Sequence, residues 1–327
     1  NGMQVLLYPD PSKPTVTVNV TYKVGSRHEN YGETGMAHLL EHLIFKGSKN
    51  YPSPDKEFNR RGFRNNGTTS FDRTNYFSTF QATDDNLRWA LDWKADAMTN
   101  SFIARKDLDS EMTVVRNEYE MGENEPFQVM FKRLFSTAFH WHNYGNSPIG
   151  NRSDIENVRI ENLQAFYRMY YQPDNAVLIV AGKFDVDKTL PLIARTFGSI
   201  PRPKRTLPVL WTVEPTQDGE RSFVVRRKGD VQVVMVGYRI PSLLSDSTAA
   251  LSAASDILGD TPNGRLHKEL VATGMAAQVF SWALQVRDPG LAMFGAVVKK
   301  GEPVEPVRDK LIEIVETSFA RQAPTDA

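Results

Sequence analysis

The sequence predicts an α+β fold built from a duplicated α/β sandwich unit. Three observations predict it: stretches in which apolar and polar residues alternate, stretches with apolar residues every three or four positions, and a return of the same order of stretches in the second half. "TVTVNVTYKVGS" at 15–26 resembles "VQVVMVGYRIPS" at 231–242. Later in both halves a strand pattern, a loop and a long helix pattern follow, so we expect an internal duplication.

The elements of the first copy follow from their periodicity. We predict strands at 4–8 and 15–24 and a helix at about 34–46. A polar segment then leads into "TTSFDRTNYFSTF", which alternates again. The run "NAVLIVAGKF" is typical of a buried strand. Further helices are expected near 84–99, 107–121, 126–139, 160–170 and 186–197.

A linker separates the two copies. "SIPRPKRTLPV" has three prolines and three basic residues in eleven positions, a composition typical of a linker. We therefore predict a first domain at 1–208 and a second, homologous domain at 209–327. The second copy reaches only the equivalent of about residue 110 of the first, so we expect it to be incomplete by about a hundred residues and the chain to be part of a longer protein.

The composition excludes several classes of site. The 39 basic and 39 acidic residues balance, which gives no indication of a nucleic-acid or membrane-surface partner. The absence of cysteine excludes disulfides, thiolate metal sites and cysteine nucleophiles. No apolar run approaches the ~18 residues of a membrane span, and no signal peptide is visible. The compartment stays unknown; a bacterial periplasmic or secreted location is expected if a leader has been removed.

The helix predicted around "GMAHLLEHLIF" at 35–45 has two distinct faces. The apolar face consists of Met36, Leu39, Leu40 and Leu43. On the other face, His38 and His42 are four residues apart, a spacing that lets two imidazoles bind one metal ion. Glu41 lies beside them, where its carboxylate can hold a water molecule and take its proton. This His-x-x-Glu-His order is the signature of inverted zincins.

"SEMTVVRNEYE" at 110–120 supplies a third ligand. Glu111 and Glu118 are seven residues apart and nearly in line on a helix, with Val114 and Val115 between them. Carboxylates that border an apolar stripe are costly unless they are paired or bind a metal. We predict Glu118 as the ligand and Glu111 as the group that orients a histidine. For Glu111 the alternative is a solvated carboxylate near the start of a helix.

"HLLEH", followed by Glu118 76 positions after His42, resembles the pitrilysin/insulinase family of zinc metallopeptidases, which includes the mitochondrial processing peptidase. "GTTSFDRTNYF", "GKFDVDKTL" and "PNGRLHKELVATGMA" fit the same family, so the resemblance covers essentially the whole chain. It implies a mixed, mainly antiparallel sheet with helices packed on it in each unit, forming half of a clamshell. It also implies one Zn²⁺ per chain, held in the first copy, because "STAALSAASDILG" in the second copy contains no histidine.

The resemblance also assigns residues that bind substrate. Asn66, Gly67 and Thr68 match the edge strand along which the backbone of the substrate lies. Phe45 matches the wall of the pocket for the residue after the cleaved bond, with a plain core residue as the alternative. Relatives take an arginine and a tyrosine from a later half, beyond Ala327. A second homologous half, in the same longer chain or in another subunit, is therefore an expected partner.

The function expected from these features is that of a zinc endopeptidase acting on peptides or unfolded polypeptides, with Glu41 as general base. Two alternatives stay open: a scaffold or regulatory subunit of the same fold that has lost catalysis, and a peptide-binding chain that needs a partner half. The presence of every motif residue favours the enzyme. The sequence "HWH" at 140–142 is interpreted as structural and not as a second metal site.

Overall fold

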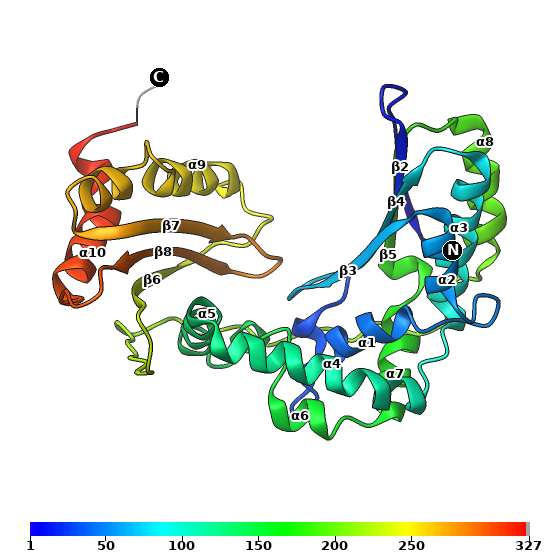
Figure 1. Ribbon diagram of the computed structural model, residues 1–327, viewed down its shortest axis with the longest axis horizontal. Coiled ribbons are helices and arrows are strands. Elements are labelled where there is room, and N and C mark those ends of the chain that lie inside the picture. The colour runs from blue at the N-terminus through cyan, green and yellow to red at the C-terminus, as the bar shows by residue number, and fades with distance from the viewer. Residues whose placement is uncertain (325–327) are drawn as a thin grey trace. The chain divides into compact units, whose positions relative to one another are not determined.

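The computed structural model describes residues 1–324, which form two compact units (Figure 1). Unit 1 comprises residues 1–122 and 141–215, and unit 2 comprises residues 123–140 and, within the described part of the chain, 216–324. Each unit combines a β-sheet with packed helices, so the predicted α+β class is confirmed. None of the helices in the described part of the chain has the length and apolar character needed to span a membrane.

Unit 1 is built on a five-stranded sheet with the order β1-β5-β2-β4-β3. Its strands are β1 (Gln4–Pro9), β2 (Thr15–Tyr22), β3 (Arg64–Thr69), β4 (Thr74–Gln81) and β5 (Ala176–Gly182). β1 and β5 pair in parallel, and every other neighbouring pair is antiparallel. The sheet is therefore mixed and mainly antiparallel, as expected. β3 lies at one edge, with only β4 as its partner among the described strands.

Seven α-helices of the described residues belong to unit 1. They are α1 (Met36–Ile44), α2 (Pro54–Arg61), α3 (Asp84–Asn100), α4 (Arg105–Asn124), α6 (Arg152–Glu156), α7 (Ile160–Tyr170) and α8 (Val186–Thr196). Of these, α1 and α3 pack directly against the sheet. Every second residue of β2 is buried, with Val16, Val18 and Val20 fully enclosed, while the residues between them are half-buried. In Figure 1, α3 and α8 lie along one side of the sheet. α1 packs against β3 and β4, which brings this helix to the edge of the sheet.

Unit 2 repeats the central part of unit 1. It contains α5 (Pro126–Ala138), β6 (Gln232–Ile240), α9 (Thr248–Gly259), β7 (Ala276–Leu284), β8 (Gly290–Val298) and α10 (Glu305–Arg321). Its antiparallel sheet has the order β6-β8-β7, which matches the order β2-β4-β3 of unit 1. Among these repeated strands, a helix comes after β2 as after β6, and a long helix follows β4 as it follows β8. The strand order therefore supports the predicted internal duplication.

Two local features differ from the sequence prediction. The stretch 68–80 is not one strand: β3 and β4 form a hairpin whose turn is closed by a hydrogen bond from the Ser70 amide to the Arg73 carbonyl. The preceding polar segment contains α2 and most of β3. Alternation continues through a short turn, so the pattern alone did not reveal the reversal of the chain.

The division into compact units also differs from the predicted domain limits of 1–208 and 209–327. The segment 123–140 packs with unit 2, where the rings of Phe127 and Phe280 lie 5.5 Å apart and those of Phe131 and Trp282 lie 6.0 Å apart. Periodicity predicts that α5 has an apolar face but does not tell which sheet covers it. The predicted limits stay a proposal about the boundary of the repeat.

Candidate metal centre

The helix that carries the histidines is anchored at its start by a distant carboxylate. Gly35, the residue before α1, has a φ of 92° and offers no side chain to cap the helix. The buried Glu29 takes over this role, because its carboxylate accepts the amides of Gly35 at 2.9 Å and Ala37 at 2.8 Å. α1 is therefore held at the end where His38 lies.

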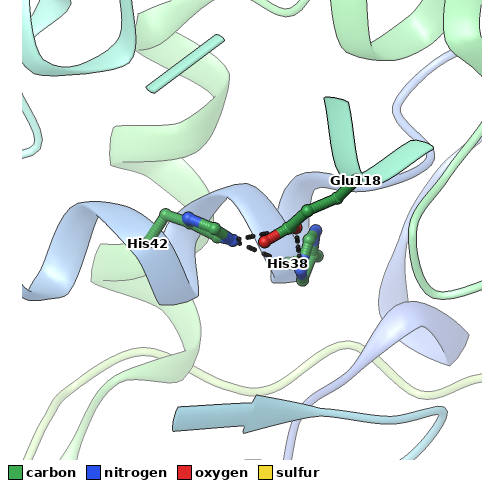
Figure 2. Close-up of side chains that lie close together, drawn as sticks. All are labelled: His38, His42 and Glu118. Atoms are coloured by element: carbon green, nitrogen blue, oxygen red, sulfur yellow. Dashed lines mark hydrogen bonds and ion pairs between the residues drawn. The ribbon is translucent and has the colours of Figure 1, made fainter. Parts of the chain in front are cut away.

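His38, His42 and Glu118 meet at one point between α1 and α4 (Figure 2). The Nε2 atoms of His38 and His42 lie 3.3 Å apart. The Oε2 atom of Glu118 lies 3.5 Å from each of them. Figure 2 shows both imidazoles and the carboxylate turned toward one another. Within residues 1–324 this is the one group of three or more such side chains close enough to share a metal ion.

The separations of these three atoms fit a tetrahedral metal ion. Ligands at about 2.0–2.2 Å from a tetrahedral zinc ion lie roughly 3.3–3.6 Å from one another. The observed separations of 3.3, 3.5 and 3.5 Å fall in that range. Two imidazole nitrogens and one carboxylate oxygen are also a donor set that catalytic zinc sites use. The residues present therefore fit the zinc ion that the motif implies.

Glu111 lies beside His42. Its Oε2 atom lies 3.1 Å from Nδ1 of His42, so the Nδ1–H donates to Glu111 and leaves the Nε2 lone pair directed at the proposed metal position. The other oxygen, Oε1, pairs with the ammonium of Lys46. Burial raises the pKa of Glu111, but its hydrogen bonds with Lys46 and His42 and their charges outweigh this effect and lower it overall. Glu111 thus contacts one of the predicted ligands, and its orienting role stays a prediction.

His38 has different surroundings. Burial, together with a smaller effect of the neighbouring His42, lowers its pKa to about 4. Its imidazole is therefore neutral at neutral pH, the state that a metal ligand requires. Its Nδ1 atom is buried and has no hydrogen-bond partner among residues 1–324. The two histidines therefore differ, because only His42 has a carboxylate next to its Nδ1.

Glu41 lies against β3, beside the three ligands. Its Oε2 accepts a hydrogen bond of 2.6 Å from the hydroxyl of Thr69. A Cβ on Gly67 would lie 2.8 Å from both Cγ and Oε1 of Glu41, so this close approach requires glycine at position 67. Burial raises the pKa of Glu41, and the hydrogen bond from Thr69 partly offsets this. The carboxylate is thus fixed through one oxygen only.

The residues predicted to bind substrate lie on or near β3. Asn66 and Thr68 are exposed on this edge strand, and the Thr68 hydroxyl donates to Oδ1 of Asn75 at 2.7 Å. Phe45, the residue directly after α1, is half-buried. Its ring lies 5.7 Å from that of Tyr76 and 6.2 Å from that of Trp93. Phe45 therefore belongs to an aromatic cluster and keeps part of its surface accessible.

Sequence reasoning missed two residues and used one reason that does not hold. Lys46 and Thr69 contact Glu111 and Glu41, although neither was singled out. Thr69 shares a strand face with Gly67 by period two, a signal that could have identified it. The side chain of Glu118 is 43% exposed, so the cost of burying a charge does not apply to this residue. That argument applies to Glu111, which is 10% exposed.

The segment "HWH" forms no metal group in the described part of the chain. His142 is buried, and its Nδ1 accepts the amide of Tyr144 at 3.1 Å. The carboxylate of Glu214 accepts the amides of Trp141 at 2.8 Å and His142 at 2.9 Å. These contacts fit the structural interpretation of this segment, because they join Trp141 and His142 to Glu214 within unit 1.

Comparison with known families and proteins gives consistent matches along the chain. Residues 4–152 match the model for insulinase (peptidase family M16), and residues 157–321 match the model for the peptidase M16 inactive domain. The zinc protease PqqE of Helicobacter pylori is 34% identical over 323 residues, which cover 97% of this chain and 72% of that protein. The uncharacterized zinc protease YmxG of Bacillus subtilis is 26% identical, over 89% of this chain and 70% of the relative.

Solved structures give the same result for the fold. The crystal structure of a protease from Helicobacter pylori matches all of this chain and 79% of its own length, with a TM-score of 0.93 and 32% identity. The crystal structure of pitrilysin matches 99% of this chain and 36% of its own length, with a TM-score of 0.76. At 21% identity, this second likeness concerns the fold alone.

Proposed function

Because the chain belongs to the insulinase family, peptidase family M16, we propose that it is a zinc-dependent endopeptidase that hydrolyses peptides or unfolded polypeptides. One observation carries the proposal: the ligand atoms of His38, His42 and Glu118 have the separations that a single tetrahedral zinc ion requires. The relatives named as zinc proteases in Helicobacter pylori and Bacillus subtilis support the same metal and the same class of reaction.

In this proposal His38, His42 and Glu118 hold one zinc ion per chain. When bound, zinc would supply Lewis acidity, which polarises a peptide carbonyl and makes a water molecule more acidic. Glu111 keeps His42 in the tautomer whose Nε2 can bind the metal. Glu118 reaches the site from α4 with an exposed carboxylate, which a substrate entering the site would cover.

Glu41 is the general base in this proposal. Thr69 occupies its Oε2, so Oε1 is the atom that takes a proton from the attacking water. The same oxygen then delivers the proton to the leaving amine nitrogen as the peptide C–N bond breaks. Gly67 keeps β3 close enough for Thr69 to fix the carboxylate in this position.

The proposed substrate site is the open edge of β3. Within the described strands β3 pairs only with β4, so its other side offers backbone amides and carbonyls to an extended peptide. Asn66, Gly67 and Thr68 supply this edge, and such main-chain contacts require no particular side chain in the substrate. Phe45 would contact the residue that follows the cleaved bond. An unfolded polypeptide fits this edge better than a folded one, since an extended backbone has to be exposed.

A second homologous half that encloses the substrate is part of the proposal, as the expected partner. It could belong to the same longer chain or to another subunit. The two rival functions, a scaffold subunit and a peptide-binding chain that depends on a partner, keep the same fold and differ in catalysis. Hydrolysis measured with and without zinc separates the enzyme from these two rivals.

The test measures hydrolysis of an unfolded protein and of a quenched-fluorescent peptide by the whole protein. A chelator should remove the activity and added zinc should restore it. Glu41→Gln should keep the zinc and lower kcat by about 10²–10⁴-fold, because a positioned acid–base group contributes that much. Glu161→Gln, an exposed carboxylate on α7, is the matched control. Unchanged turnover in Glu41→Gln would remove Glu41 from the mechanism, and zinc binding without any hydrolysis would favour the rival functions.

A further inference from the structure

Lys46 lies next to the metal centre but outside the set of ligands. It follows α1 directly, after Phe45, and its ammonium pairs with Oε1 of Glu111 on α4. The second oxygen of Glu111 lies 3.1 Å from Nδ1 of His42. Lys46, Glu111 and His42 therefore form a continuous chain of contacts that ends at one of the proposed ligands.

The backbone that carries Lys46 is firmly held. Gly47 has a φ of 127°, and a Cβ at this position would lie 2.6 Å from the carbonyl oxygen of Pro52. Oδ2 of the Asp96 carboxylate accepts the Ser48 hydroxyl at 2.6 Å and the Asn50 amide at 2.9 Å. The side chain of Lys46 therefore extends from a well-held backbone and can keep the carboxylate of Glu111 in place.

Glu111 needs such a partner to keep its orientation. Its side chain is 10% exposed, so few water molecules can replace a lost contact. A carboxylate held through one oxygen can rotate, whereas contacts at both oxygens define its plane. Lys46 holds Oε1, which leaves Oε2 directed at His42. Burial raises the pKa of Asp55 on α2, and the charges of Lys46 and Glu111 act on it in opposite directions.

We propose that Lys46 is a positioning residue of the zinc centre, which acts through Glu111 to keep Nε2 of His42 directed at the metal. The inference rests on the proposed zinc site. Replacing a residue that orients a histidine ligand typically lowers metal affinity or activity by about 10–100-fold. Lys46 acts one contact further away, so we expect an effect near the lower end, about tenfold. His38 has no such chain of contacts in the described residues, because its Nδ1 has no partner.

Lys46 has two expected effects on zinc affinity, and they have opposite signs. Its contact with Glu111 should strengthen zinc binding, whereas its positive charge should weaken it. A cation repels a nearby divalent ion, so loss of the charge alone would make zinc bind more tightly. At an ionic strength of about 0.15 M, charges beyond about 8 Å are largely screened, and Lys46 is separated from the metal position by two side chains. The sign of the change in zinc affinity therefore distinguishes positioning from simple repulsion.

The experiment measures the zinc affinity of the metal-free protein by competition with a chromophoric chelator at about 0.15 M salt. Lys46→Met should weaken zinc binding about tenfold, and Lys46→Arg should restore most of the affinity, since a guanidinium can also pair with Oε1. In a Glu111→Gln background, Lys46→Met should have no further effect, because the path through Glu111 is already broken. Lys49→Met, an exposed lysine on the same loop, should bind zinc like the wild type.

Unchanged or tighter zinc binding by Lys46→Met would overturn the proposal. It would also be overturned if Lys46→Met lowered zinc affinity as much in the Glu111→Gln background as in the wild type. The thermal transition of each metal-free variant serves as the control for folding, and Lys46→Gln replaces Lys46→Met if the latter does not fold. A wild type that binds zinc no better than His42→Ala would instead overturn the zinc centre itself. Failure of the proposal for Lys46 can therefore be distinguished from failure of the proposed zinc centre.

Discussion

Gly67 of β3 lies next to Glu41 of α1. A methyl group on Gly67 would lie 2.8 Å from Cγ and Oε1 of Glu41, well inside van der Waals contact. The strand cannot move away without disturbing its pairing with β4, where Gly67 lies opposite Tyr76. The side chain of Glu41 would therefore have to move, and with it the proposed general base.

We expect Gly67→Ala to keep its zinc and lower kcat by roughly 10²-fold, because a displacement of about 1 Å at a catalytic group can have that effect. Zinc content and peptide hydrolysis of the same sample provide the measurement. Gly219→Ala is the control, since a Cβ on Gly219 would contact nothing. If Gly67→Ala turned over substrate at the wild-type rate, the contact between β3 and Glu41 would have no part in positioning the base.

At the scale of elements, α3 carries a lysine into the core. Lys94 is 3% exposed, and its ammonium donates to the carbonyl oxygen of Tyr76 at 3.1 Å. It also lies 4.7 Å from the centre of the Trp93 ring. Burial lowers the pKa of Lys94 to about 7, since the charged form loses its hydration. The free energy of unfolding is therefore expected to depend on the protonation of Lys94.

This pKa shift predicts how stability changes with pH. Above the unfolded pKa of 10.5, Lys94 is neutral in both states and its burial carries no charge penalty. As the pH falls toward 7 the unfolded chain binds the proton first, which lowers the free energy of unfolding by up to roughly 1.4 kcal/mol per pH unit. Lys94→Met removes this effect. The free energy of unfolding of Lys94→Met minus that of the wild type should therefore be more positive at pH 7 than at pH 9.5.

Urea unfolding of wild type and Lys94→Met at both pH values tests this expectation. Lys183 is an exposed lysine after β5. The free energy of unfolding of Lys183→Met should differ from that of the wild type by the same amount at both pH values. An equal difference at pH 7 and pH 9.5 for Lys94→Met would mean that Lys94 keeps its ordinary pKa in the folded protein.

Sequence periodicity predicted most elements of unit 1 and the ligand-bearing helix, but not the contacts between elements. α1 and α7 were predicted closely because their apolar stripes repeat at helical spacing. The hairpin between β3 and β4 was missed, since alternation runs through its turn. Lys46 and Thr69 lie far along the chain from the carboxylates they contact, and no local pattern records such pairs. The spacing of Glu111 and Glu118 was informative because one helix carries both.

At the scale of the whole molecule, the two units share a strand order but differ in chemistry. The strand order β2-β4-β3 returns as β6-β8-β7, and α9 takes the place in unit 2 that α1 has in unit 1. α9 carries no histidine, whereas α1 carries His38 and His42. The duplicated fold therefore predicts one zinc ion per chain and not two.

The zinc content of the purified protein and of matched histidine variants tests the central claim most directly. We expect about one zinc ion per chain in the wild type, because three protein ligands define a single catalytic-type site. His42→Ala should lose almost all of it, and His140→Ala, from the segment interpreted as structural, should retain it. Two zinc ions per chain, or equal zinc in the wild type and His42→Ala, would contradict the assignment of the metal to His38, His42 and Glu118.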